Sequence, residues 1–301
     1  MARTLFPALL LLFTIGTNAD AQTAGENTRG TLFIVGGGPQ PAPLVKEFVD
    51  LAGGAGRARI VVFAMASSSG HTSGEEKAAD FRALGAEARN VFVNREQADT
   101  DSIARLLDGV TGVWFGGGDQ VLLARALQGT RTERAIHARY AAGAVIGGTS
   151  AGAAVMSTQM ITGDERRLGG DRPPRDSSEA FITIDRNNIV VDSGFALLPY
   201  AIVDQHFVRR KRQNRLVSLV LEMPVRLGVG IDESTALVVE PNGQWRVSGA
   251  SIAIVYDARQ SAVTAPGSTL GATGLRMHVL PAGGRFDPRT GNATLPPAAN
   301  P

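Results

Sequence analysis

The run of small residues at 147–154, with one serine inside it, is the feature that most restricts how this chain can fold. It follows the apolar residues 144–146, so the local layout is a strand, a very tight turn and a helix. Only Gly and Ala fit around Ser150 in such a turn, which leaves the serine hydroxyl clear of the backbone. The N–H of Ala151 and the start of the helix then point to the place where a developing oxyanion is held. The pattern predicts a nucleophilic serine, although a Gly-rich packing turn or a phosphate cradle has the same local appearance.

Apolar segments of strand length alternate with amphipathic segments of helix length over the first half of the chain. Strands are predicted at 31–35, 59–64, 91–93, 112–115 and 144–146, and helices at 43–52, 75–84, 102–107, 121–127 and 132–142. This alternation predicts an α/β fold with a mostly parallel sheet flanked by helices on both faces. Extra short strands are predicted in the C-terminal part, at 227–231, 235–239, 245–247 and 252–256.

The domain organisation follows from length and composition. The chain of 301 residues carries no clear interdomain linker, and its 44% hydrophobic and 19% charged residues suit one sizeable core. We therefore expect a single α/β domain over residues 31–283. The segment 163–178 is charged and rich in Gly and Pro, which predicts a surface loop near the site. Residues 284–301 are rich in Pro, Gly and Asn, and a poorly ordered tail is predicted there.

The first 21 residues are typical of a secretory signal peptide. A positive start is followed by an apolar core at 5–15, and residues 17–21 supply an A-x-A cleavage site before Gln22. The apolar run is short of the roughly 20 residues that span a bilayer, so a membrane anchor is less favoured. The sequence thus predicts a secreted or periplasmic protein with no membrane contact after cleavage, in which residues 22–30 form a linker.

Composition also excludes some classes of site. The chain has no cysteine, which excludes disulfides, thiolate metal sites and a cysteine nucleophile. Its formal net charge is only +2, which argues against nucleic acid as the main partner. Neither a metal nor a cofactor is expected.

A nucleophilic serine needs a base that takes its proton. The chain has four histidines, of which His206 is the best placed. It follows the apolar residues 201–203 within the run Asp204-Gln205-His206. A strand that ends in such groups delivers them to the edge where open α/β sheets build their sites.

The base in turn needs an acid that orients it. Glu233 is the candidate, because it follows the apolar strand predicted at 227–231, although an ordinary polar turn has the same composition. Along the chain, the nucleophile, the base and the acid then occur in the order Ser150, His206, Glu233. The rival order Ser150, Glu233, His278 is that of the α/β-hydrolases, and it would indicate an esterase.

Two glycine runs follow predicted strands. Gly118, with Gly117 as the close alternative, is the candidate for a second oxyanion donor beside Ala151. The run at 116–120 lacks the third glycine of a dinucleotide-binding motif. The run at 36–38 lacks a Walker lysine, and we interpret it as a structural turn or a pocket wall.

A basic segment at 209–215 precedes an amphipathic helix. Steps of four and three residues back from Leu216 lead to Arg212 and Arg209, in line with the buried stripe of the helix. Guanidinium groups that face the site bind carboxylates with two hydrogen bonds. The substrate should therefore carry acidic groups near the bond that is cleaved.

Four motifs in this order resemble the cyanophycinase branch of the S51 serine peptidases. They are G-G-D-Q at 117–120, G-T-S-A-G-A at 148–153, D-Q-H-F at 204–207 with three arginines after it, and G-I-D-E-S-T-A at 230–236. The resemblance covers about residues 30–260 and implies a class I glutamine amidotransferase-like fold. It also implies Ser150 as nucleophile, His206 as base and Glu233 as the orienting acid.

The resemblance assigns the remaining site residues and the substrate. The residues implied in substrate binding are Gln120, Asp204, Gln205, Arg210, Arg212 and Arg215, so the family pattern points to Arg210 where periodicity points to Arg209. Members of this branch are peptidases of β-aspartyl peptides: they hydrolyse cyanophycin, a polyaspartate with arginine on each side chain, to β-aspartyl-arginine dipeptides. A neighbouring branch contains aspartyl and isoaspartyl dipeptidases, which is the alternative. The family suggests a homodimer, and the predicted signal peptide is a departure from the many members that act inside cells.

Overall fold

The computed structural model describes residues 30–166, 181–223, 225–265 and 269–298. The predicted signal peptide at 1–21 and the linker at 22–30, except Gly30, lie outside these residues, as does most of the loop predicted at 163–178. Residues 163–165 of that loop belong instead to a strand, β6 (Gln159–Glu165), which pairs with β7 (Ile189–Ser193).

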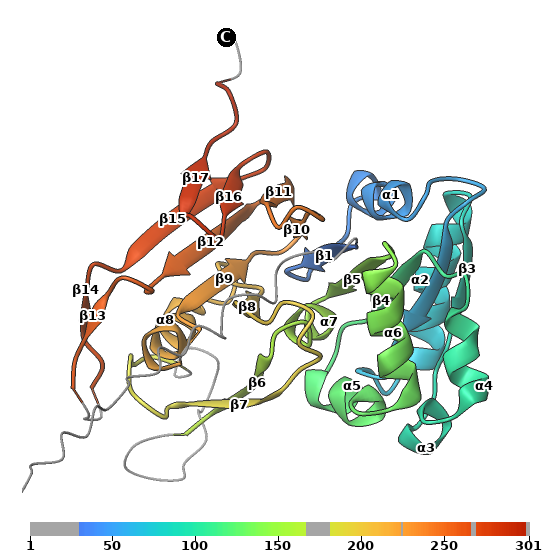
Figure 1. Cartoon of the computed structure of the whole chain (residues 1–301), viewed down its shortest axis with the longest axis horizontal. Coiled ribbons are helices and arrows are strands. Elements are labelled where there is room, and N and C mark those ends of the chain that lie inside the picture. The colour runs from blue at the N-terminus through green and yellow to red at the C-terminus, as the bar shows by residue number, and fades with distance from the viewer. Residues whose placement is uncertain (1–29, 167–180, 224, 266–268, 299–301) are drawn as a thin grey trace, which may run out of the picture.

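The largest sheet formed by the described residues has nine strands. Five come from the first half of the chain and are parallel: β1 (Thr31–Val35), β2 (Arg59–Phe63), β3 (Glu87–Asn90), β4 (Gly112–Phe115) and β5 (Val145–Thr149). Four come from the C-terminal part and are antiparallel: β10 (Thr235–Val239), β11 (Trp245–Gly249), β16 (Arg285–Asp287) and β17 (Asn292–Thr294). The order across the sheet is β17-β16-β11-β10-β1-β5-β4-β2-β3 (Figure 1). The predicted α/β fold is confirmed, with its parallel strands in the half of the sheet that carries the helices.

Helices cover both faces of this parallel half. On one face lie α1 (Ala42–Leu51) and α2 (Gly70–Ala83), and on the other lie α3 (Arg95–Ala98), α4 (Asp101–Ala104), a 3₁₀ turn (Arg105–Leu107), α5 (Gln120–Leu127), α6 (Arg131–Ala141) and α7 (Ala151–Ala154). Side chains of a strand alternate between the two faces. Phe33 of β1 therefore packs with Phe48 of α1, whereas Leu32 and Ile34 belong to the core under the second group of helices. Because both faces are buried, the strands read as continuous apolar runs.

A smaller sheet carries the other half of the site. Its strands are β8 (Ile202–Gln205), β9 (Leu227–Ile231), β12 (Ile252–Asp257) and β15 (Arg276–Pro281), in the order β15-β12-β9-β8. The helix α8 (Gln213–Glu222) packs on it through Leu216 and Leu219, and a short hairpin joins β13 (Ala262–Val263) to β14 (Ala272–Thr273). β8 and β9 are parallel, so their carboxyl ends lie level, with Gln205 opposite Ile231.

Two predicted segments are corrected. The strand expected at 91–93 is β3 at Glu87–Asn90, a sheet-edge strand whose alternating exposed and buried residues do not form an apolar run. The tail expected to be poorly ordered from residue 284 contains β16 and β17, which extend the large sheet. Phe286 explains the difference, because its ring lies 5.3 Å from that of Trp245 and is buried in the core. The buried ring and the pairing of β16 with β11 together attach a segment whose composition is otherwise that of a loop.

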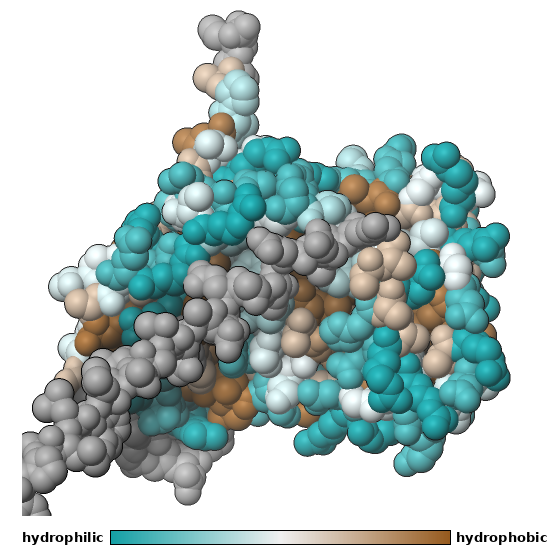
Figure 2. Space-filling model, in the orientation of Figure 1, coloured by the Kyte–Doolittle hydropathy of each residue, from teal (hydrophilic) through white to brown (hydrophobic). Residues whose placement is uncertain are grey.

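The surface seen in Figure 2 is mostly hydrophilic, with apolar atoms in small patches between polar ones. In the part of the chain that the structure describes, no helix combines the length and apolar character needed to cross a membrane.

Candidate active site

Ser150 lies in a sharp turn at the carboxyl end of β5. Its φ is 53°, a region that few residues other than glycine adopt, and its N–H donates to the carbonyl oxygen of Val35 at 3.1 Å. The flanking glycines are required by contact. A Cβ on Gly148 would lie 2.4 Å from the carbonyl oxygen of Gly152, and a Cβ on Gly152 would lie 2.2 Å from that of Phe115. The small residues at this turn therefore allow the strained backbone that exposes the serine.

The structure brings Ser150, His206 and Glu233 into one hydrogen-bonded chain. His206 Nε2 lies 2.9 Å from Ser150 Oγ, and His206 Nδ1 lies 2.6 Å from Glu233 Oε1. Because an ionised carboxylate can only accept, Nδ1 carries the proton and Nε2 is free to accept the serine proton. Each of the three residues follows the carboxyl end of a strand, as expected: Ser150 follows β5, His206 follows β8, and Glu233 lies in the turn after β9.

The structure does not bring His278 into hydrogen-bond contact with Ser150 or Glu233, as the rival order requires. His278 lies on β15, at the edge of the smaller sheet, with its ring 5.4 Å from that of Phe286. Its Nε2 has no hydrogen-bond partner among the described residues. The geometry therefore supports the order Ser150, His206, Glu233 and not the α/β-hydrolase order.

The glycine run after β1 packs directly against the histidine and the glutamate. Gly37 has a φ of +107°, and a Cβ there would lie 2.3 Å from Cε1 of His206. Gly38 has a φ of +68°, and a Cβ there would lie 2.7 Å from Cβ of Glu233. The main chain adds two bonds, because His206 N–H donates to Gly36 and Ser234 N–H donates to Gly37. The run interpreted as a turn or pocket wall thus positions two members of the hydrogen-bonded chain.

Burial sets the protonation state of His206. Only 7% of this residue is exposed, and burial is the main cause that lowers its pKa below the ordinary value of 6.5. The positive charges of Arg210 and Arg212 lower it further, while the hydrogen bond and the charge of Glu233 oppose the shift. At neutral pH the imidazole is therefore uncharged and able to accept a proton.

Asp204 and Arg215 form a buried ion pair behind the histidine. Arg215 Nε donates to Asp204 Oδ2 at 2.7 Å, Nη2 donates to Oδ1, and each residue is 1% exposed. The guanidinium also lies 5.0 Å from the centre of the Phe181 ring. The resemblance implies that both groups bind substrate, and in the structure they pair with each other and join β8 to α8.

Gln205 and Gln120 also have internal partners. Arg212 Nη1 donates to the carbonyl oxygen of Gln205 at 2.8 Å and to its Oε1 at 2.7 Å. Burial is the main cause that lowers the pKa of Arg212 to about 10, and it remains charged at neutral pH. Gln120 Nε2 donates to the carbonyl oxygens of Ile161 at 2.7 Å and Thr162 at 2.5 Å, so it joins α5 to β6.

Arg210 and Arg209 are both exposed. Arg210 affects His206 through its charge, whereas the main-chain N–H of Arg209 donates to Asp232 Oδ1. The periodicity that placed Arg209 in line with the buried stripe was wrong, because α8 begins only at Gln213 and the helical repeat does not extend back to residue 209. Arg212 lies one residue before the helix and is partly buried, so the prediction that it lies in line with the buried stripe is correct.

The expected oxyanion donors lie in two turns, one that carries Ser150 and one that follows β4. Ala151 follows it as the first residue of α7, and a Cβ on Gly117 would lie 3.6 Å from the Cβ of Ser150. Gly118 has a φ of +134°, and a Cβ there would lie 2.1 Å from the carbonyl oxygen of Ala66, so the position requires glycine. Within the described ranges no three His, Asp or Glu side chains lie close enough to hold a metal ion.

An α/β sheet whose strand ends carry a Ser–His–Glu chain defines a serine hydrolase. The model of peptidase family S51 matches residues 32–245, and the chain belongs to this family of serine peptidases. The cyanophycinase of Trichormus variabilis is 34% identical over 272 residues, which cover 87% of this chain and 86% of that protein. The cyanophycinase of Geminocystis herdmanii is 30% identical over 275 residues, which cover 87% and 95%.

Two solved structures show the same fold. A peptidase from an acI-B1 actinobacterium has a TM-score of 0.62 at 22% identity, covering 86% of this chain and 96% of that one. A putative peptidase E from Listeria monocytogenes has a TM-score of 0.50 at 16% identity, covering 74% and 99%. The predicted class I glutamine amidotransferase-like fold is thereby confirmed.

Proposed function

We propose that this chain is an exported cyanophycinase that releases β-aspartyl-arginine dipeptides from cyanophycin. The hydrogen-bonded chain Ser150–His206–Glu233 is the observation that carries the proposal, because it supplies nucleophile, base and orienting acid in one place. The identity of 30–34% with cyanophycinases over 87% of the chain supports the choice of substrate. The signal-peptide pattern at 1–21 supports export.

In this proposal Ser150 Oγ attacks the scissile carbonyl carbon while its proton moves to His206 Nε2. The carbonyl oxygen becomes an oxyanion, held by the N–H groups of Gly118 and Ala151, each such donor being worth roughly 10²–10³-fold in rate. His206 then gives the proton to the departing amine, and the acyl group remains on the serine. Water, activated by the same histidine, attacks the acyl-enzyme and regenerates Ser150. Glu233 orients the imidazole and stabilises its charged form throughout.

The cationic groups beside His206 suit a substrate rich in carboxylates. Arg210 is exposed and Arg212 is partly exposed, and both lie close enough to His206 to lower its pKa. We assign them to the unit that leaves with the amine, because that unit lies on the histidine side. Asp204, Gln205, Gln120 and Arg215 act in this proposal by holding the site in shape, through the internal bonds described above.

The test is to incubate residues 22–301 with purified cyanophycin and to identify the soluble products by mass spectrometry. We expect β-aspartyl-arginine from the wild type and none from Ser150→Ala or His206→Ala. His278→Ala is the matched histidine control and should remain active. Cleavage of short isoaspartyl dipeptides with no release from the polymer would move the chain to the dipeptidase branch, and activity lost only in His278→Ala would overturn the assigned base.

Export is tested separately. The full chain is expressed in a Gram-negative host, and the N-terminus of the protein in the periplasm and medium is sequenced. A mature chain that begins at Gln22 is the expected result. An uncleaved chain that stays in the cytoplasm would contradict the proposal.

A further inference from the structure

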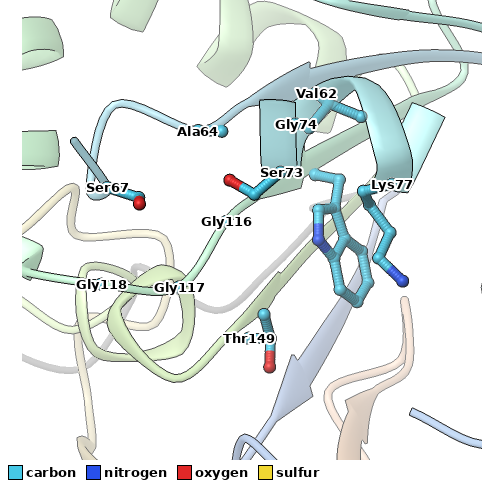
Figure 3. A pocket seen from close by; sticks show the side chains of 11 residues that line it. Val62, Ala64, Ser67, Ser73, Gly74, Lys77, Gly116, Gly117, Gly118 and Thr149 are labelled. Carbon is cyan, nitrogen blue, oxygen red and sulfur yellow. The ribbon is translucent and has the colours of Figure 1, made fainter. Parts of the chain in front are cut away.

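A cavity of about 440 Å³ opens at Thr149, the residue before Ser150, and its volume is within the usual range of small-molecule sites. Figure 3 shows Ser67 and Ser73 on one side of it and the turn at Gly116–Gly118 across from them. The cavity is further lined by Thr149, which precedes the serine, and by Lys77 and Trp114. The proposed mechanism uses only the turn at Gly116–Gly118 on one edge of this cavity, and it gives the rest of the lining no role.

The cavity lies on the acyl side of the site. In the large sheet β5 lies between β1 and β4. The glycines after β1 pack against His206, whereas the turn after β4 lines the cavity. His206 and the cavity therefore lie on opposite sides of Ser150. Since the leaving amine must lie at the histidine that protonates it, the cavity is on the side of the unit that stays on the serine.

In the described part of the chain, the lining carries a single charged group. None of the described residues that line the cavity is acidic, and Lys77 supplies a positive charge. The Lys77 ammonium lies 2.8 Å from Asp80 Oδ2, but the Asp80 side chain is 57% exposed, so this pair holds the ammonium only weakly. The lysine is therefore free to exchange its partner for a ligand carboxylate.

Trp114 supplies the second observation. The residue is 2% exposed, and its indole Nε1 is buried without a hydrogen-bond partner among the described residues. Leaving a buried donor unpaired is costly, and such a group calls for an acceptor that the protein itself does not provide. The Lys77 ammonium lies 6.0 Å from the centre of this indole ring, so the N–H donor and the charge lie on neighbouring groups.

We propose that this cavity is the subsite for a carboxylate of the substrate unit that forms the acyl-enzyme, with Lys77 and the Trp114 N–H as its partners. The inference rests on the proposed function. In a β-aspartyl-arginine unit, the arginine is attached through its amino group and its own carboxylate is free. Recognition of that carboxylate on the acyl side complements the arginines on the leaving side.

The test measures binding without turnover. Ser150→Ala is titrated calorimetrically with β-aspartyl-arginine and with the same dipeptide whose arginine carboxyl is an amide. We expect the acid to bind at least ten times more tightly than the amide. Lys77→Met in the Ser150→Ala protein should remove this preference. Trp114→Phe, which keeps the ring and loses the N–H, should weaken binding of the acid more than binding of the amide.

Lys46→Met is the matched control, because Lys46 forms a comparable pair with Asp50 at 2.7 Å on α1. It should keep the full preference for the acid. Equal binding of acid and amide by Ser150→Ala, no binding of the acid, or an unchanged preference in Lys77→Met would overturn the subsite.

Hydrolysis of cyanophycin by the wild type is measured alongside and separates the two proposals. Release of dipeptide together with an unchanged preference in Lys77→Met would leave the function standing and overturn the subsite. A preference that Lys77→Met removes, without hydrolysis of the polymer, would support the subsite and overturn the function.

Discussion

At the scale of single residues, the geometry of the site depends on glycines as much as on the reacting side chains. Gly148 and Gly152 allow the turn that exposes Ser150, and Gly37 lies against the ring of His206. A side chain at any of these positions would displace a reacting group by about the size of a methyl. Misplacement of about 1 Å can cost 10²-fold in rate.

Gly37→Ala should lower kcat by roughly 10²-fold or more, because the new Cβ would lie 2.3 Å from His206 Cε1 and must push the ring from Ser150. The measurement is kcat on cyanophycin, with the melting temperature as a check on folding. Gly54→Ala is the matched control, since Gly54 also has a positive φ of +79° but an added Cβ would meet nothing within 4 Å. It should cost about 1 kcal/mol of stability and leave kcat unchanged. Equal kcat losses in both variants would contradict the argument.

The pH dependence is also a property of single residues. His206 must be neutral to accept the serine proton, so kcat/KM should fall as the pH drops through its pKa, which lies below 6.5. Arg210→Gln removes a positive charge that lowers this pKa, so the pKa should rise. The acid limb of the pH profile, where kcat/KM falls, should then move to higher pH. Arg209→Gln, an exposed arginine one residue away, should leave the limb in place. A limb that moves to lower pH in Arg210→Gln would contradict the assignment of His206.

At the scale of elements, the site is built where two sheets meet. Ser150 follows β5 of the large sheet, whereas His206 and Glu233 follow β8 and β9 of the smaller one. The Asp204–Arg215 pair fastens β8 to α8, immediately before the histidine. The position of His206 thus depends on a contact between a strand end and a helix.

Arg215→Met should destabilise the fold by about 3–5 kcal/mol, because the buried Asp204 carboxylate loses its two-bond partner and keeps only the Arg212 guanidinium, 3.8 Å away. The double variant Asp204→Leu with Arg215→Met should recover part of this loss, since the buried carboxylate is then removed together with its main partner. Urea denaturation measures all three. The control Arg285→Met removes an exposed partner of Glu240 and should cost less than about 1 kcal/mol. If Arg215→Met were as stable as the double variant, the buried carboxylate would not be the cause of the lost stability.

At the scale of the whole molecule, the C-terminal strands complete the large sheet. β16 and β17 lie beyond β11 at its edge, and Phe286 closes the core over Trp245. Residues close to the C-terminus therefore contribute to the same sheet and core as β1, which begins at Thr31.

Phe286→Ala should destabilise the protein by about 3–5 kcal/mol, since its ring is 1% exposed and packs against Trp245. Leu295→Ala, next to β17 and 68% exposed, is the control and should be close to neutral. Urea denaturation of both variants measures the difference. Equal midpoints would show that the tail does not contribute to the core.

The amino-acid sequence determined the parallel half of the sheet and the tight turn at Ser150, and it supplied the candidates for the other site residues. Strands buried on both faces read as apolar runs, and small residues must surround a serine in a tight turn, so these features are local. Ser150, His206 and Glu233 could be named because each follows an apolar strand.

Only the tertiary structure decided which histidine reaches the serine, what the charged residues bind, and where the tail goes. Asp204 and Arg215 pair with each other, Arg209 lies outside the helix, and Phe286 attaches a loop-like segment to the core. The cavity with Lys77 and Trp114 gave no signal in the sequence, because its lining comes from four separate segments. Contacts between residues far apart in the chain depend on packing and desolvation, and no local sequence pattern predicts either of these.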